Sequence, residues 1–233
     1  MPQFKIVFSI FFVTLISASP FSAAVEEGFI EPTAIATAKE QRQQQVKTGW
    51  TSEVAIERRV AALAELALIT TDTIEDLERI DRLLTRFQEL LSGNKNDPEL
   101  TAAMGSLYSY KASLFTDNLA KLSILSRKGT RFMDKAVKDG PKHLGARLQR
   151  GVACANMPPF VKRAHFAVED LTIVRDQINE DYGVEFKNFV EYFLALATLR
   201  NGQESAARKL WKTASLRGDN LWATKSKEAL AKL

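Results

Sequence analysis

Apolar residues recur at intervals of three and four positions along most of this 233-residue chain, and this spacing constrains the fold more than any other feature. Between residues 74 and 91 the recurrence marks one face of an amphipathic helix. No segment shows the alternation of period two that a half-buried strand requires. With only 11 Gly and 7 Pro, the chain also has too few turn-forming residues for a sandwich or barrel of short strands. We therefore expect an all-α fold.

Capping and helix-breaking residues divide this pattern into separate helices. Asp97-Pro98 predicts a helix start, because Asp caps the first turn and Pro is tolerated at the first helical position. The apolar stripe from Leu100 to Leu122 predicts a helix of about seven turns after it. We expect antiparallel helix pairs near residues 53–91, 98–139, 142–178 and 184–217, with a capping helix at 220–232.

The first 24 residues have the features of a signal peptide. Lys5 precedes an apolar run at 6–16, and Ser22-Ala23-Ala24 places small residues at a cleavage site. The run is shorter than the roughly 20 residues that cross a bilayer, so a retained membrane anchor is the weaker alternative. We expect cleavage after Ala24, a flexible leader at 25–48 with room for a short helix, and a helical domain at 49–233. The expected location is periplasmic or secreted, with no stable membrane span after cleavage.

Small and aromatic residues near the C-terminus are spaced as in a known repeat. Ala195 and Gly202 are followed by Ala207, Trp211 and Ala214 at spacings of five, four and three. This spacing resembles the tetratricopeptide repeat (TPR), in which small residues let two antiparallel helices approach and an aromatic residue fills the space between them.

Two earlier fragments extend the resemblance. The segment 136–151 resembles a junction between two repeats, and Gly105 with Tyr108 resembles the first helix of another. Gly105 and Gly151 are 46 residues apart, and Gly151 and Ala195 are 44 apart, compared with about 34 in a standard TPR. The resemblance implies a TPR-like α-solenoid of stacked helix pairs, with repeats enlarged to about 45 residues.

Positive charge is concentrated in the middle of the chain. Residues 25–126 contain 11 Lys and Arg against 16 Asp and Glu, residues 127–163 contain 10 against 2, and the remainder balances. Such a segment predicts a surface for a protein or peptide partner of acidic character, or for an anionic envelope component. A solvated face that offsets the acidic first half is the alternative. The predicted partner-binding residues are Arg131, Lys135, Lys138, Lys142, Arg147 and Arg150.

The sequence contains no motif that identifies a reaction. Neither histidine lies in an HExxH, and His165 with Glu169 one turn away gives too few ligands for a metal. Arg163 is expected to pair with Glu169 and Asp170 at the surface. Cys154, the only cysteine, lies among small residues, as a buried structural cysteine does. We expect no catalytic residues, no metal and no cofactor. We also expect no nucleic-acid partner, because the chain is predicted to be exported and lacks basic–aromatic interleaving.

The resemblance and the absence of catalytic motifs favour a binding protein. The predicted function is a non-catalytic, exported TPR-like scaffold or adaptor that binds a protein or peptide partner in the bacterial periplasm. The alternative is an accessory subunit of a transport system, similar to the T-components of TRAP transporters, which have enlarged helical repeats and associate with a solute-binding protein. An envelope-active enzyme, with carboxylates assembled from distant segments, is a third hypothesis.

Overall fold

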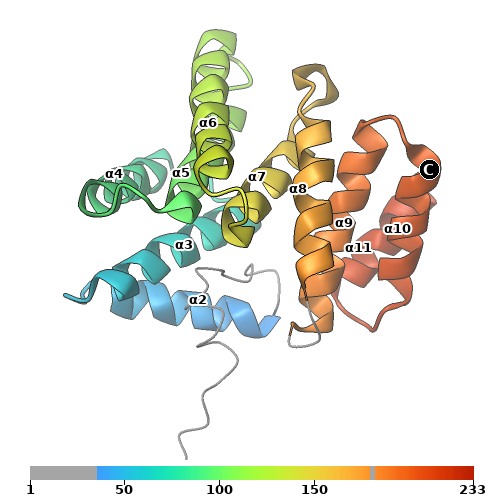
Figure 1. Ribbon diagram of the computed structural model, residues 1–233, viewed down its shortest axis with the longest axis horizontal. Helices are drawn as coiled ribbons and strands as arrows, with labels where there is room; N and C mark the ends of the chain where they lie inside the picture. The colour runs from blue at the N-terminus through green and yellow to red at the C-terminus, as the bar shows by residue number, and fades with distance from the viewer. Residues whose placement is uncertain (1–35, 179–181) are drawn as a thin grey trace, which may run out of the picture.

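The computed structural model describes residues 36–178 and 182–233, which contain ten α-helices, one short 3₁₀ turn and no strand (Figure 1). The predicted all-α fold is confirmed. The predicted signal peptide and the first part of the leader lie outside the described residues. The elements are α2 (Ala36–Gly49), α3 (Ala55–Thr71), α4 (Leu77–Gly93), α5 (Pro98–Ser113), α6 (Leu119–Asp139), α7 (Leu144–Asn156), η1 (Pro159–Val161), α8 (Ala164–Gln177), α9 (Val184–Arg200), α10 (Glu204–Leu216) and α11 (Leu221–Ala231).

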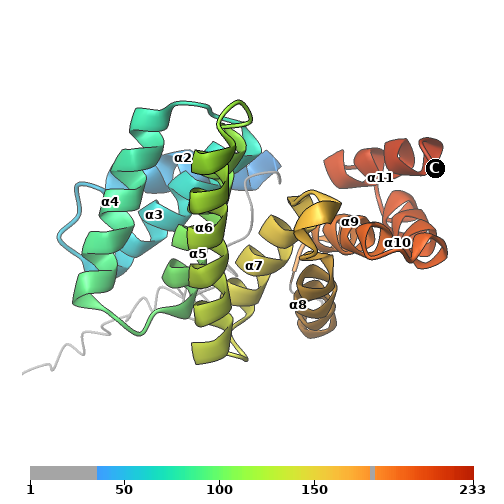
Figure 2. The same ribbon diagram turned by 90° about the horizontal axis from the view of Figure 1, so that it is seen from above.

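The helices pack in chain order, as a row that runs from α2–α4 at one side of the molecule to α9–α11 at the other (Figures 1 and 2). Among the described helices, every substantial contact joins elements one or two places apart in the chain. The most extensive pairs are α5–α6, α7–α8, α2–α3 and α9–α10. Each first helix of the later pairs also contacts the next one, α5 with α7 and α7 with α9. The packing as helix pairs is thereby confirmed. The predicted first pair at 53–91 corresponds to α3 and α4, but α3 contacts α2 more extensively than α4.

The segment 25–48 is not a flexible leader throughout. From Ala36 it forms the 14-residue helix α2, which packs more extensively on α3 than α4 does. Its sequence is rich in Lys, Glu, Gln and Arg, which favour helices, but it lacks an apolar stripe. The contact uses unusual side chains instead, because Arg42 is buried and Gly49 lies directly against Ala61. A hydrophobic pattern does not reveal a helix that docks in this way.

The apolar stripe from Leu100 to Leu122 does not form one helix. Helix α5 ends at Ser113, and α6 begins at Leu119 after a turn. Asn118 caps α6, since its side chain accepts a hydrogen bond from the Lys121 N–H at 3.0 Å. Leu114 packs against the core from within the turn, so the apolar period continues through the break.

Small residues lie where the helices of a pair approach closely. A Cβ added at Gly105 of α5 would lie 2.6 Å from the carbonyl oxygen of Gly129 on α6. A Cβ at Gly151 of α7 would lie 2.7 Å from Cγ of Leu171 on α8. Ala195 of α9 is fully buried in a cluster with residues of α10. The three residues spaced 46 and 44 positions apart therefore occupy corresponding places in successive helix pairs.

A buried ion network fixes the start of α5. The Asp97 side chain accepts a hydrogen bond from the Leu100 N–H at 2.9 Å, which confirms the predicted cap. Arg59 of α3 donates to Asp97 through Nε at 2.6 Å and to Glu99 through Nη2 at 2.8 Å. Burial acts to raise the pKa of Asp97, but the hydrogen bonds and charge of Arg59 outweigh it and hold that pKa below its ordinary value.

The predicted helix at 220–232 is present as α11. Asn220 accepts hydrogen bonds from the backbone N–H groups of Trp222 and Ala223 at 3.1 and 3.0 Å. Trp222 is buried, and its ring meets that of Phe189 edge-on with centroids 4.9 Å apart. Trp222 is therefore a core residue. It covers apolar side chains of α9, which would otherwise be exposed at the end of the row of helices.

Candidate functional site

The exposed side of α6 presents a stripe of positive charge. Its cations follow one another at spacings of one, three and four positions, which places them along one side of a helix. We call these residues the basic face; they are Arg127, Lys128, Arg131, Lys135 and Lys138. All five are exposed, and Lys142 is exposed just beyond the end of the helix. Four of the six predicted partner-binding residues therefore lie on or next to this surface.

Most of this charge is not neutralised by neighbouring side chains. Lys135 pairs with Asp139 one turn further along α6. Within residues 36–178 and 182–233, no carboxylate forms an ion pair with Arg131, Lys138 or Lys142. Because exposed cations without partners keep their full charge, this part of α6 has a positive potential.

The N-terminal half of the basic face contains a shallow hollow of about 600 Å³. It is lined by residues of α6, including the apolar side chains of Ile124 and Phe132. Phe132 stacks on Tyr108 of α5 with ring centroids 5.8 Å apart, and Lys128 Nζ lies 4.2 Å from the Tyr108 ring centroid. Phe132 therefore gives the hollow an apolar floor that is supported by α5, and the cations of α6 lie around it.

Sequence reasoning placed Arg127 and Lys128 in the basic segment but not among the partner-binding residues, and it missed Ile124 and Phe132 altogether. The helical register from residue 124 to residue 135 contains the signal, because all of these side chains fall on one face at spacings of three and four. The sequence does not show that these side chains line a hollow, because the hollow depends on the packing of α5 behind Phe132.

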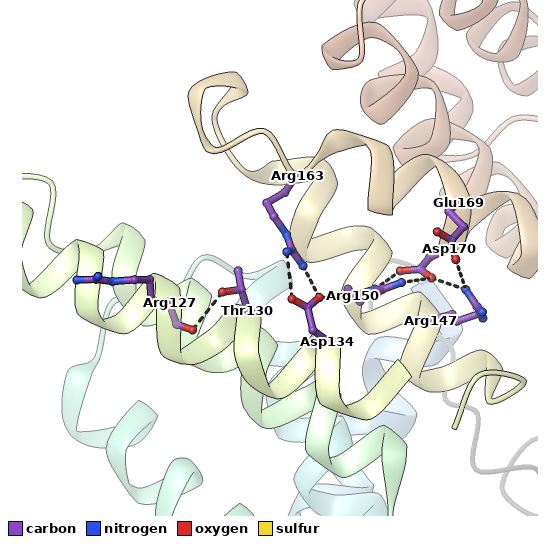
Figure 3. A network of polar contacts seen from close by, with 8 residues as sticks. All are labelled: Arg127, Thr130, Asp134, Arg147, Arg150, Arg163, Glu169 and Asp170. Atoms are coloured by element: carbon purple, nitrogen blue, oxygen red, sulfur yellow. Dashed lines mark hydrogen bonds and ion pairs between the residues drawn. The ribbon is translucent and has the colours of Figure 1, made fainter. Parts of the chain in front are cut away.

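Arg147 and Arg150 do not belong to an interaction surface. They are only 7% and 5% exposed, and both converge on Asp170, which is fully buried (Figure 3). Arg150 donates to Asp170 through Nε at 2.6 Å and through Nη2 at 2.9 Å. Arg147 donates to Asp170 through Nη1 at 2.7 Å and to the Pro141 carbonyl through Nε, also at 2.7 Å. Their guanidinium groups are thus held inside the protein by hydrogen bonds and are too buried to form a partner-binding surface.

The same cluster corrects the expected surface pairing of Arg163 with Glu169 and Asp170. Arg163 instead donates to Asp134 of α6, through Nη1 at 3.0 Å and through Nη2 (Figure 3). Burial raises the pKa of Asp170, while the hydrogen bonds and charges of Arg150 and Arg147 act to lower it. Because its members come from α6, α7 and α8, the cluster joins two successive helix pairs.

The remaining reactive side chains have structural surroundings. Cys154 is buried, as its small neighbours indicated, and burial raises the pKa of its thiol although the charge of Arg163 opposes the change. His165 is exposed, and its ring lies tilted against that of Phe166 with centroids 4.0 Å apart. In the described part of the chain, no three His, Cys, Asp or Glu side chains are grouped to hold a metal ion.

Comparison with known proteins gives no relative: no family model, no curated protein and no solved structure matches the chain. Among the described helices, none combines the length and the apolar character needed to cross a membrane. The case for function therefore depends on the geometry of the helices and their surfaces.

Proposed function

We propose that this protein is an exported, non-catalytic adaptor of TPR-like architecture that captures an acidic segment of a partner protein in the bacterial periplasm. The observation that carries the proposal is the basic face of α6, with its unpaired cations and its hollow with an apolar floor. An acidic segment with one or two apolar side chains complements both the charge and the floor.

The architecture supports a repeat-like binding protein. Among the described helices, substantial contacts join only near neighbours in the chain. This is the defining property of solenoids, which expose a long surface on stacked helix pairs. The small residues at positions 105, 151 and 195 occupy corresponding places in three pairs. This recurrence is consistent with the enlarged TPR-like unit of about 45 residues proposed from the sequence.

The test is affinity capture from envelope extracts of the native host, using the exported chain that begins at Val25. The site variant combines Arg131→Glu, Lys138→Glu and Lys142→Glu. The matched control combines Lys209→Glu, Lys212→Glu and Lys227→Glu, which makes the same change in net charge at exposed positions of α10 and α11. Bound proteins are quantified by mass spectrometry at about 0.05 and 0.5 M salt, which spans weak and strong screening.

The expected result is a dominant protein partner that the wild type and the control retain at low salt and that the site variant loses. Equal capture by the site variant would show that the basic face is not the binding surface. Retention of no protein by any of the three would contradict the adaptor function itself.

A further inference from the structure

The connection between α7 and α8 holds an aromatic side chain out in solvent. Phe160 lies in the 3₁₀ turn η1 and is 77% exposed. Pro158 and Pro159 precede it, and the Val161 and Lys162 N–H groups donate to the carbonyl oxygens of these two prolines, each at 3.0 Å. Two prolines and two internal hydrogen bonds make this turn stiff, so Phe160 is presented on a preformed tip.

Both ends of the turn are anchored to neighbouring helices. Arg200 at the end of α9 donates to the carbonyl oxygens of Met157, at 2.9 Å, and of Ala155. On the other side, Arg163 reaches down to Asp134 of α6, as Figure 3 shows. Contacts at both ends of the turn therefore fix its position. The exposure of the Phe160 side chain is a property of this fixed turn and does not result from a loose loop.

A second apolar tip lies at the same end of the molecule. The α5–α6 turn and the α7–α8 turn are both at the top of Figure 1. Leu119 at the start of α6 is 75% exposed, and Ile124 five residues further on is also exposed. Leu119 and Phe160 are thus among the most exposed large apolar side chains of the described residues, and their turns lie at the same end of the molecule in Figure 1.

The charge around these two tips is strongly positive. Residues 114–132 contain four cations and one carboxylate, and residues 157–163 contain two cations and no carboxylate. Apolar side chains that project singly from tips, among Lys and Arg, are typical of surfaces that lie on anionic lipid, where the apolar groups enter the headgroup region and the cations meet the phosphates. The core of a protein interface is instead a packed cluster of buried side chains, whereas Leu119 and Phe160 project from separate turns.

We propose that the end of the molecule formed by the α5–α6 and α7–α8 turns docks peripherally on an anionic phospholipid surface, with Phe160 and Leu119 inserted between the headgroups. Lys121, Arg127 and Lys162 supply the electrostatic part of this attraction. This end of the molecule shares Arg127 with the basic face but does not include Arg131, Lys138 or Lys142, which the adaptor test reverses.

Vesicle flotation tests this docking. The chain beginning at Val25 is mixed with vesicles of phosphatidylglycerol and phosphatidylcholine, or of phosphatidylcholine alone, because the apolar run at 6–16 would insert by itself. The tip variant combines Phe160→Ser with Leu119→Ser. The matched control is Leu216→Ser, since Leu216 is 76% exposed but lies at the far end of α10, at the bottom of Figure 1.

We expect the wild type and the Leu216→Ser control to float with the phosphatidylglycerol vesicles and not with phosphatidylcholine alone. The tip variant should bind about tenfold more weakly or worse, because two apolar anchors are lost. A variant with Lys121→Glu, Arg127→Glu and Lys162→Glu should also lose binding, whereas the Lys209, Lys212 and Lys227 reversals should not.

Three results would overturn the docking proposal. They are no flotation of the wild type, an equal loss in the Leu216→Ser control, and unimpaired flotation of the tip variant. If the tip variant instead keeps its flotation and loses protein capture, the tips belong to the protein-binding surface. Because capture and flotation are separate readouts, failure of the membrane proposal leaves the adaptor proposal standing, and the reverse also holds.

Discussion

Arg150 and Asp170 form a two-point ion pair in the interior, with Nε donating to Oδ2 at 2.6 Å and Nη2 donating to Oδ1 at 2.9 Å. The pair joins α7 to α8, and Arg150 also lies within ion-pair distance of Asp134 on α6. Two planar groups that match in this way fix both the spacing and the rotation of the helices that hold them.

Loss of the central carboxylate should therefore be costly. Asp170→Asn removes the one buried countercharge that Arg147 and Arg150 share and leaves them only the more exposed Glu169 and Asp134. We expect the free energy of unfolding to fall by about 3–5 kcal/mol in urea denaturation. Asp176→Asn on the same helix is the control, because Asp176 is exposed and should change stability by no more than about 0.5 kcal/mol. Similar values for the two variants would show that the buried cluster does not hold the helices together.

The contact between α5 and α6 predicts a strong effect from a single methyl group. Gly105→Ala places a Cβ within 2.6 Å of a backbone oxygen of α6, so the two helices must separate. We expect a loss of about 1–3 kcal/mol in the free energy of unfolding. Gly93→Ala at the end of α4 is the matched substitution, since a Cβ there meets nothing within 4 Å. If Gly105→Ala is tolerated as well as Gly93→Ala, the close approach at Gly105 is not required.

Asp97 should make the stability depend on acid pH. Its pKa is lower in the folded protein than in the unfolded chain, where an Asp titrates near about 3.9. Its ionised form therefore adds stability above that pH, and the contribution disappears as the pH falls below about 4 through the folded pKa.

Asp97→Asn isolates this effect, because Asn also caps helices while lacking the charge. Urea denaturation at a series of pH values between about 7 and 3 should show a shallower loss of stability for the variant than for the wild type. Parallel curves would mean that Asp97 does not contribute to the acid sensitivity.

Cys154 should be chemically silent in the native protein. Its thiol is buried, and burial raises its pKa, so the reactive thiolate is scarce at neutral pH. We expect an aromatic disulfide reagent to react slowly with the folded chain and rapidly in denaturant, with one equivalent consumed because the chain has one cysteine. Equal rates in the two conditions would show that the thiol is accessible in the native fold.

The sequence predicted the helices better than it predicted the sites. The cap at Asp97 and the capping helix at 220–232 are present as expected, because caps and breakers act locally. The turn before Leu119 was missed, since Leu114 keeps the apolar period while the backbone changes direction. The leader was expected to have room for a short helix, but the length and docking of α2 were not predicted, because α2 has no apolar stripe.

The burial of Arg147 and Arg150 shows what a single sequence leaves undetermined. A charge cluster favours a solvated surface, and only the tertiary fold brings Asp170, 20 residues after Arg150, into reach of both side chains. A local signal does exist, because Arg147 and Arg150 are in register with the buried residues Gly151 and Cys154 on one side of α7. Two cations on the inward face of a helix require an internal partner, and the acidic pair on α8 supplies it.

The restriction of substantial contacts to helices one or two places apart also has a mechanical consequence. A tensile load along the row passes from one helix pair to the next, so the weakest junction between pairs yields first. If a partner pulled on the basic face of α6 while α11 was held, only the junctions between α6 and α11 would be strained. The ion cluster around Asp134 and Asp170 spans the junction between the α5–α6 and α7–α8 pairs. Its ion pairs would resist separation of these two pairs under load.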